Sequence, residues 1–188
     1  MPSAWKKISV ITLITSLFLI GGCASKTVVE SDLRIKGAPD WVNEGTNVLK
    51  NKDGRLFHGV GAAPAMGDDS LQRSTADDRA RAELARILSS YLTVASNDYI
   101  ASAQSGGESF TDQSVSRSIE NLSNLNITGA RIIGRWKDKR TGMVYSIAEL
   151  DMKHLKKTVE QVELMNPNFG KFIQQQGENV FDRMSEGE

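Results

Sequence analysis

Cysteine is nearly absent from this sequence, since Cys23 is the only one in 188 residues. A single cysteine excludes a disulfide within the chain and every metal site built from several thiolates. Histidine is almost as scarce: His58 and His154 are the only two, and neither has a second ligand at a metal-binding spacing. We therefore expect no metal, no cofactor and a domain that is held together by its apolar core alone.

The chain also lacks an excess of charge of either sign and lacks a long apolar run. It has 23 basic and 23 acidic residues and no block of basic side chains, which argues against nucleic acid as a partner. The longest apolar stretch, residues 8–20, has about 13 residues, whereas a membrane-spanning helix needs about 20. Neither a nucleic-acid-binding protein nor a transmembrane protein is expected.

A short leader at the N-terminus has the order of a secretory signal, with lysines before residue 8 and an apolar run after it. Its ending, LIGGC at residues 19–23, resembles a bacterial lipobox, in which lipid is attached to the cysteine and the chain is cleaved before it. We predict a lipoprotein signal peptide over residues 1–22 and a lipidated Cys23 that carries acyl chains such as palmitate. The alternatives are an ordinary signal peptide followed by a buried thiol, and a cytosolic N-terminal helix.

The residues after Cys23 predict where the mature protein is held. Residues 24–27, Ala-Ser-Lys-Thr, are small and polar and suit an extended chain, and we predict a polar tether over residues 23–38. In lipoprotein signals an aspartate after the cysteine favours the inner membrane, and the chain has Ala24 there. We therefore expect an outer-membrane protein on the periplasmic face, anchored by several acyl chains, because each buried CH₂ contributes only about 0.8 kcal/mol.

Hydrophobic periodicity predicts a mixed fold in the remainder. A strand is expected over residues 55–63, after a turn at 51–54. Asp68 and its neighbours form a helix start, and apolar residues at spacings of three or four extend the helix to about residue 104, with Asp77 on the polar face. Trp41 is expected to anchor the core near the start of the folded part.

The second half continues with two strands and two further helices. Residues 110–126 suit a helix or a strand, and we favour the helix. Strands are expected over residues 127–137 and 143–151, joined as a hairpin. One face of the first strand is expected to carry Ala130, Ile132, Gly134 and Trp136. A helix follows from about Asp151, and after a break at Pro167 a last amphipathic segment runs to residue 184.

The predicted fold class is therefore α+β, with a small antiparallel sheet packed on a long helix in β-α-β-β order and with C-terminal helices. We place the domain at residues 39–165 and a C-terminal amphipathic segment at 166–188. With Cys23 lipidated, no thiol is available for chemistry inside the domain.

The order of these elements resembles that of a known family. PDW at residues 39–41, GVGA at 59–62, ADDRARAELA at 76–85 and the aromatic residues Trp136 and Tyr145 of the hairpin resemble the LPP-twenty family of outer-membrane lipoproteins, over residues 39–160. The resemblance implies a dodecin-like α+β domain without catalytic residues. It also implies a structural role like that of the FlgP-like flagellar assembly lipoproteins, which form rings around the flagellar motor at the outer membrane.

No constellation in the sequence indicates catalysis. Gly59-Val60-Gly61 is a lone G-x-G without the rest of a nucleotide-binding motif, and it is more typical of close contact between a strand and a helix. Paired aspartates at 68–69 and 77–78 suit capping and solvation, because adjacent helical residues point about 100° apart. We expect the protein not to be an enzyme.

Two surfaces are candidates for contact with a partner. One is the basic hairpin, represented by Arg131, Arg135 and Lys137, which otherwise reads as a solvated strand face. The other is the C-terminal apolar face, with Phe169, Phe172 and Phe181, which otherwise docks on its own domain.

These surfaces and the lipid anchor favour a non-enzymatic structural or assembly component of the cell envelope. The most specific form of this hypothesis is a flagellar outer-membrane ring, formed by self-association or with other flagellar proteins. The alternative is a monomeric periplasmic module that binds peptidoglycan or regulates a cell-wall synthase.

Overall fold

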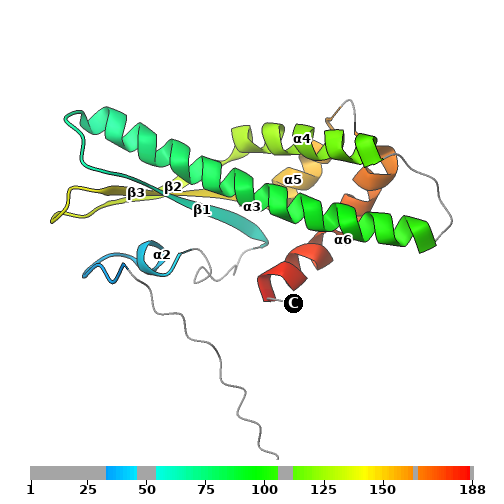
Figure 1. The fold of residues 1–188 in the computed structure, drawn as a ribbon, viewed down its shortest axis with the longest axis horizontal. Helices are drawn as coiled ribbons and strands as arrows, with labels where there is room; N and C mark the ends of the chain where they lie inside the picture. Colours follow the sequence, from blue (N-terminus) through cyan, green and yellow to red (C-terminus); the bar gives the residue numbers. More distant parts are fainter. Residues whose placement is uncertain (1–32, 46–53, 106–111, 163–164, 187–188) are drawn as a thin grey trace, which may run out of the picture. The chain divides into compact units, whose positions relative to one another are not determined.

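Three antiparallel strands form one sheet in the order β1-β3-β2. They are β1 (Leu56–Ala63), β2 (Arg131–Lys137) and β3 (Val144–Asp151). The structure, a computed structural model, describes residues 33–45, 54–105, 112–162 and 165–186, all within the compact unit Ser31–Glu188. The predicted α+β class with a long helix on a small antiparallel sheet is confirmed (Figure 1).

A long helix, α3 (Asp69–Ser105), covers one face of the sheet at β1 and β3. Its 37 residues span about 55 Å at 1.5 Å per residue. The helix begins where the sequence predicts, because the Asp68 carboxylate accepts hydrogen bonds from the amides of Ser70 and Leu71 at 2.7 and 3.0 Å. Such a side chain satisfies amides that a helix leaves without partners in its first turn.

The G-x-G motif lies where α3 meets β1. A Cβ at Gly59 would come within 2.8 Å of the Leu84 Cα atom, and a Cβ at Gly61 within 2.7 Å of the Ala76 carbonyl oxygen. The helix backbone therefore rests directly on the strand backbone, as the motif predicts.

The C-terminal half of α3 belongs to a helical core beside the sheet (Figure 1). It packs with α4 (Asp112–Gly129) and α6 (Pro167–Glu186), while α5 (Met152–Val159) contacts both of them. Fully buried side chains from all four helices meet in this core: Tyr91, Leu92, Leu122, Leu155, Phe169 and Ile173. The predicted boundary at residues 165/166 therefore separates elements of one core. Among the residues that the structure describes, no helix combines the length and the hydrophobicity of a membrane span.

The start and the phase of β2 differ from the sequence prediction. Residues 127–129 are helical because α4 continues to Gly129, so the strand begins at Arg131. A bulge between Ile132 and Gly134 then adds one residue to the strand. Ile132 pairs with Ala148, on the face covered by α3, whereas Gly134 and Trp136 pair with Ile147 and Tyr145 on the other face. The expected common face is therefore wrong, since a bulge reverses the alternation of side chains.

Near the start of the described chain, the short helix α2 (Asp40–Asn43) also corrects an expectation. Its buried side chain is Val42, whereas Trp41 is only partly buried. Trp41 is thus not the core anchor that the sequence suggested.

Candidate functional site

The predicted lipidation site, Cys23, lies outside the described residues, as do the signal peptide at 1–22 and most of the tether at 23–38. Lipidation therefore stays a prediction from the sequence. The two candidate contact surfaces, by contrast, lie within the described part.

On the basic hairpin, each of the three candidate cations faces a carboxylate of the same chain. Arg131 Nη2 lies 3.0 Å from Glu149 Oε1, and Lys137 Nζ lies 3.1 Å from Asp69 Oδ1. Arg135 donates two hydrogen bonds to Asp77, at 2.7 and 2.5 Å. These three cations are therefore neutralised from within the chain, which weakens their case as a docking surface for an acidic partner.

Asp77 is the buried member of this set and was misplaced by the sequence analysis, which put it on the polar face of the helix. Only 11% of its side chain is exposed, and it also accepts a hydrogen bond from the Ser146 hydroxyl at 2.5 Å. Burial alone raises the pKa of Asp77, but hydrogen bonds from Arg135 and Ser146 and the nearby positive charges outweigh it. The pKa of this carboxyl is therefore below its usual range. The missed signal is its spacing, because Asp77 lies three residues before buried Ala80 and seven before Leu84.

At pH 7 we expect Asp77→Asn to lower the free energy of unfolding by about 1.5–3 kcal/mol, since charge-assisted hydrogen bonds contribute about that much. The folded-state pKa lies below the unfolded value of about 3.9, so this stabilisation is complete above that value and is lost as the pH falls through the folded pKa. Urea denaturation from pH 7 to pH 3 should therefore show the difference between variant and wild type shrinking below about pH 4. Asp78→Asn is the matched control, because the Asp78 side chain is 76% exposed; a difference for Asp77→Asn that does not change with pH would contradict the assignment.

The C-terminal phenylalanines are part of the core rather than a free apolar face. Phe169 has no exposed surface, and its ring centroid lies 5.6 Å from that of Tyr99. Phe172 also packs on Tyr99, and Phe181 packs edge-on against Phe57 at 4.9 Å. The expectation that Phe169 contacts a partner is therefore corrected: α6 docks on its own domain, and Phe172 and Phe181 are partly buried against the same core.

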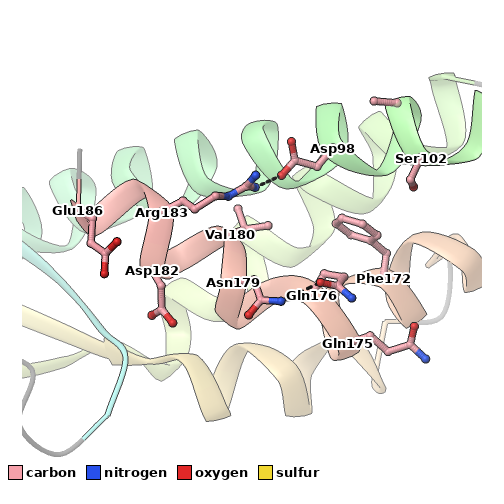
Figure 2. A pocket seen from close by; sticks show the side chains of 11 residues that line it. Asp98, Ser102, Phe172, Gln175, Gln176, Asn179, Val180, Asp182, Arg183 and Glu186 are labelled. Carbon is pink, nitrogen blue, oxygen red and sulfur yellow. Dashed lines mark hydrogen bonds and ion pairs between the residues drawn. The ribbon is translucent and has the colours of Figure 1, made fainter. Parts of the chain in front are cut away.

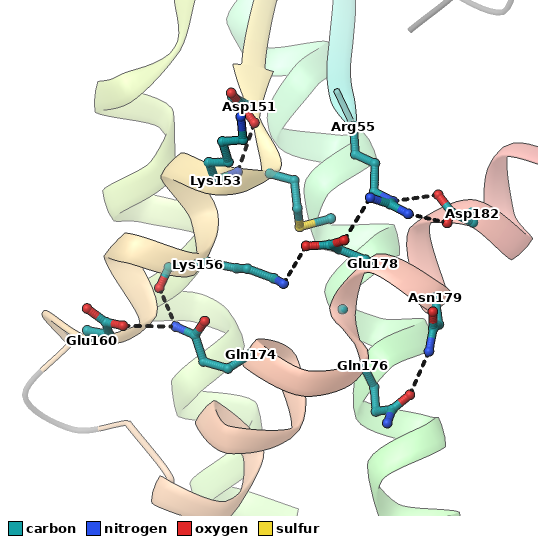
Figure 3. A network of polar contacts seen from close by, with 12 residues as sticks. Arg55, Asp151, Lys153, Lys156, Glu160, Gln174, Gln176, Glu178, Asn179 and Asp182 are labelled. Carbon is teal, nitrogen blue, oxygen red and sulfur yellow. Dashed lines mark hydrogen bonds and ion pairs between the residues drawn. The ribbon is translucent and has the colours of Figure 1, made fainter. Parts of the chain in front are cut away.

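A polar network joins α6 to the start of β1 and to α5 (Figure 3). The Arg55 guanidinium donates to both carboxylate oxygens of Asp182 at 2.6 Å and to Glu178 at 2.7 Å. Lys156 donates to the other Glu178 oxygen at 2.6 Å. The hydrogen bond from Arg55 lowers the pKa of Asp182, and that from Lys156 lowers the pKa of Glu178. Arg55 is more than 100 residues from both of its partners, and Lys156 is 22 residues from Glu178, so no local sequence pattern predicts this network.

An open groove of about 840 Å³ runs between α3 and α6 (Figure 2). Its charged lining residues are Asp98, Asp182, Glu186 and Arg183, and Arg183 forms an ion pair with Asp98 across the groove. Asp182 is also held by Arg55. The Arg183–Asp98 ion pair adds to the contacts that hold α6 against α3, whereas Asp182 links α6 to Arg55, the residue before β1. The groove is open and is lined by both polar and apolar side chains.

The two histidines are placed apart, as the sequence suggests. His58 lies on the sheet face opposite α3, 8% exposed, with its Nε2 atom 3.2 Å from Glu149 Oε2. Burial lowers the pKa of His58 and outweighs the opposing effect of Glu149. The His154 ring occupies the space beside Gly129. Among the described residues no group of three or more potential ligands is arranged to hold a metal ion.

No model of a protein family matches the chain, and no curated protein matches it.

Proposed function

We propose that the protein is a non-enzymatic lipoprotein of the outer membrane, held at its periplasmic face by acyl chains on Cys23. The single observation that carries the proposal is the leader, in which a basic start and an apolar run of about 13 residues end in LIGGC. A run of that length suits a cleaved signal, and the cysteine after it is the only one in the chain.

Its role in this proposal is mechanical, as a structural or assembly component of the cell envelope, with a flagellar outer-membrane ring as the specific version. The described polar side chains support this view. Arg55, Asp77, Arg135 and Glu178 are all engaged in contacts between elements of the fold. These side chains therefore hold the elements of the fold together and form no catalytic arrangement, which is consistent with a structural role.

Replacement of the anchor residue tests the proposal. Mass spectrometry of the wild-type protein is expected to show an N-terminal acylated cysteine, and radiolabelled palmitate is expected to be incorporated. Cys23→Ala should abolish labelling and N-terminal maturation, because the sulfur that carries the lipid is missing. Ser25→Ala, two residues further on, is the matched control and should be labelled like the wild type. An intact precursor or an unacylated mature terminus in the wild type would refute the lipoprotein assignment.

The flagellar version has its own test. Deletion of the gene should impair swimming. Normal flagella and motility in the deletion strain would contradict the flagellar role and would not affect the lipoprotein assignment. A monomer that co-sediments with purified sacculi would instead favour the peptidoglycan-binding alternative.

A further inference from the structure

A second pocket lies between the first turns of α3 and the end of β2, apart from the groove between α3 and α6. Its volume is about 350 Å³, within the range of about 300–1,000 Å³ for small-molecule sites. Its walls carry three cations, Arg73 from α3 and Arg135 and Lys137 from β2, and one carboxylate, Asp69. With Asp77 behind Arg135 included, positive charge still exceeds negative charge by one at this pocket.

Arg135 is held in place while part of its guanidinium stays unused. Its Nε and Nη2 atoms donate to the two carboxylate oxygens of Asp77, and Asp77 also accepts from the Ser146 hydroxyl. A guanidinium has five N–H donors, and these two bonds leave the others, on Nη1 and Nη2, for a further acceptor. Because the Arg135 side chain lines the pocket and is 46% exposed, an anion in the pocket can reach this free end of the fork.

The other two cations of the pocket are only weakly engaged. Arg73 donates from Nε to the main-chain oxygen of Asp69 at 3.3 Å, and no carboxylate of a described residue pairs with its guanidinium. Lys137 lies 3.1 Å from the Asp69 carboxylate, but both side chains are more than half exposed, and such exposed pairs are weak. Pairing within the chain therefore argues against a broad acidic partner at the hairpin, but it leaves a small site with unused cationic donors.

We propose that this pocket binds the phosphate group of a ligand. A phosphate offers three strong acceptor oxygens, so the free end of the Arg135 fork, Arg73 and Lys137 can contact it together. A carboxylate has only two oxygens, which the fork of Arg135 satisfies alone, so it makes less use of the other cations. The proposal goes beyond the proposed function, because it requires neither the lipid on Cys23 nor assembly of the protein.

Titration of the detergent-extracted full chain with inorganic phosphate, at constant ionic strength, measures the binding. Trp136 also lines the pocket, so its fluorescence should change and saturate as phosphate binds. The melting temperature is a second readout, because a ligand that binds only the folded state stabilises that state by mass action. Phosphate strengthens apolar burial in any protein, so only the part of the increase that disappears in a pocket variant reports on the site.

Arg73→Gln is expected to weaken phosphate binding about fivefold, because it removes one cation from an exposed site. Arg73 forms no ion pair with a described residue, so its substitution should leave the melting temperature in the absence of phosphate unchanged. Arg86→Gln is the matched control, since it removes an exposed arginine from the same helix outside the pocket lining. This control should bind phosphate like the wild type.

Asp69→Asn should have the opposite effect. The Asp69 carboxylate lines the pocket and competes with phosphate for Lys137, so its removal is expected to strengthen phosphate binding about threefold. Asp78→Asn removes the same charge from the same helix, but Asp78 lies outside the pocket lining and its side chain is 76% exposed. This second control should leave the affinity for phosphate unchanged.

Saturable binding that changes as expected in both pocket variants supports the site. A titration without saturation, an equal affinity for acetate, or a pocket variant that behaves like its control overturns it. Phosphatidylglycerol added to the detergent micelles distinguishes two sources of the phosphate: competition with inorganic phosphate indicates a lipid headgroup, and no competition indicates a soluble phosphate compound. Palmitate labelling tests the anchor on Cys23 separately, so failure of this proposal and failure of the lipoprotein assignment are distinguishable.

Discussion

Gly61→Ala is expected to lower the free energy of unfolding by about 3 kcal/mol, a large part of the 5–15 kcal/mol that holds a typical domain together. The added methyl would lie 2.6 Å from the Arg79 carbonyl carbon and 2.7 Å from the Ala76 carbonyl oxygen. These are main-chain atoms of a helix, so no side chain can rotate away to relieve the overlap. Relief requires α3 to lift from β1, which would expose the core between them. Thermal or urea denaturation followed by circular dichroism measures the loss.

Gly67→Ala is the matched control for this substitution. Gly67 has an ordinary backbone conformation, and a Cβ there meets nothing within 4 Å. The control should change the free energy of unfolding by no more than about 0.5 kcal/mol. If Gly61→Ala changes the free energy of unfolding as little as the control does, the helix and strand backbones are not in the close contact described.

Phe169→Ala is expected to cost about 3–5 kcal/mol, because it removes a fully buried aromatic side chain and leaves a cavity. Phe169 has no exposed surface and contacts the Tyr99 ring in the helical core. A residue at a partner-binding surface would behave differently: its truncation would weaken association and leave the isolated domain stable. The urea midpoint of the full chain therefore distinguishes a core residue from a contact residue.

Met184→Ala, later in the same helix, is the control, because Met184 is 38% exposed. Its substitution should alter stability by about 0.5 kcal/mol or less. Equal stability of the Phe169→Ala variant and the wild type would show that α6 does not pack as described.

Local patterns predicted most of the fold. Asp68 marks the start of α3, and the G-x-G motif indicates its contact with β1. Each of these signals acts through neighbours in the sequence or through the size of a single residue, so each can be read without a structure. The turn between the two hairpin strands is equally local.

The candidate surfaces were less predictable, because their character depends on partners distant in sequence. Arg135 reads as an exposed cation until Asp77, 58 residues away, is placed beside it. Arg55 meets Asp182 across 127 residues. The bulge at Ile133 is likewise set by pairing with β3 and leaves no mark in the composition of β2. Sequence periodicity reports which residues are apolar, whereas ion pairs and strand register are decided by tertiary packing.

Helix α3 belongs both to the layer that covers the sheet and to the helical core, and this determines how the domain unfolds under force. Its N-terminal half covers the sheet, and its C-terminal half supplies Tyr91 and Leu92 to the helical core. Because a continuous helix couples the two regions, neither can open without disturbing the other, and they form one cooperative folding unit rather than two. A pull transmitted through a lipid tether would therefore meet a single high barrier instead of a series of small ones.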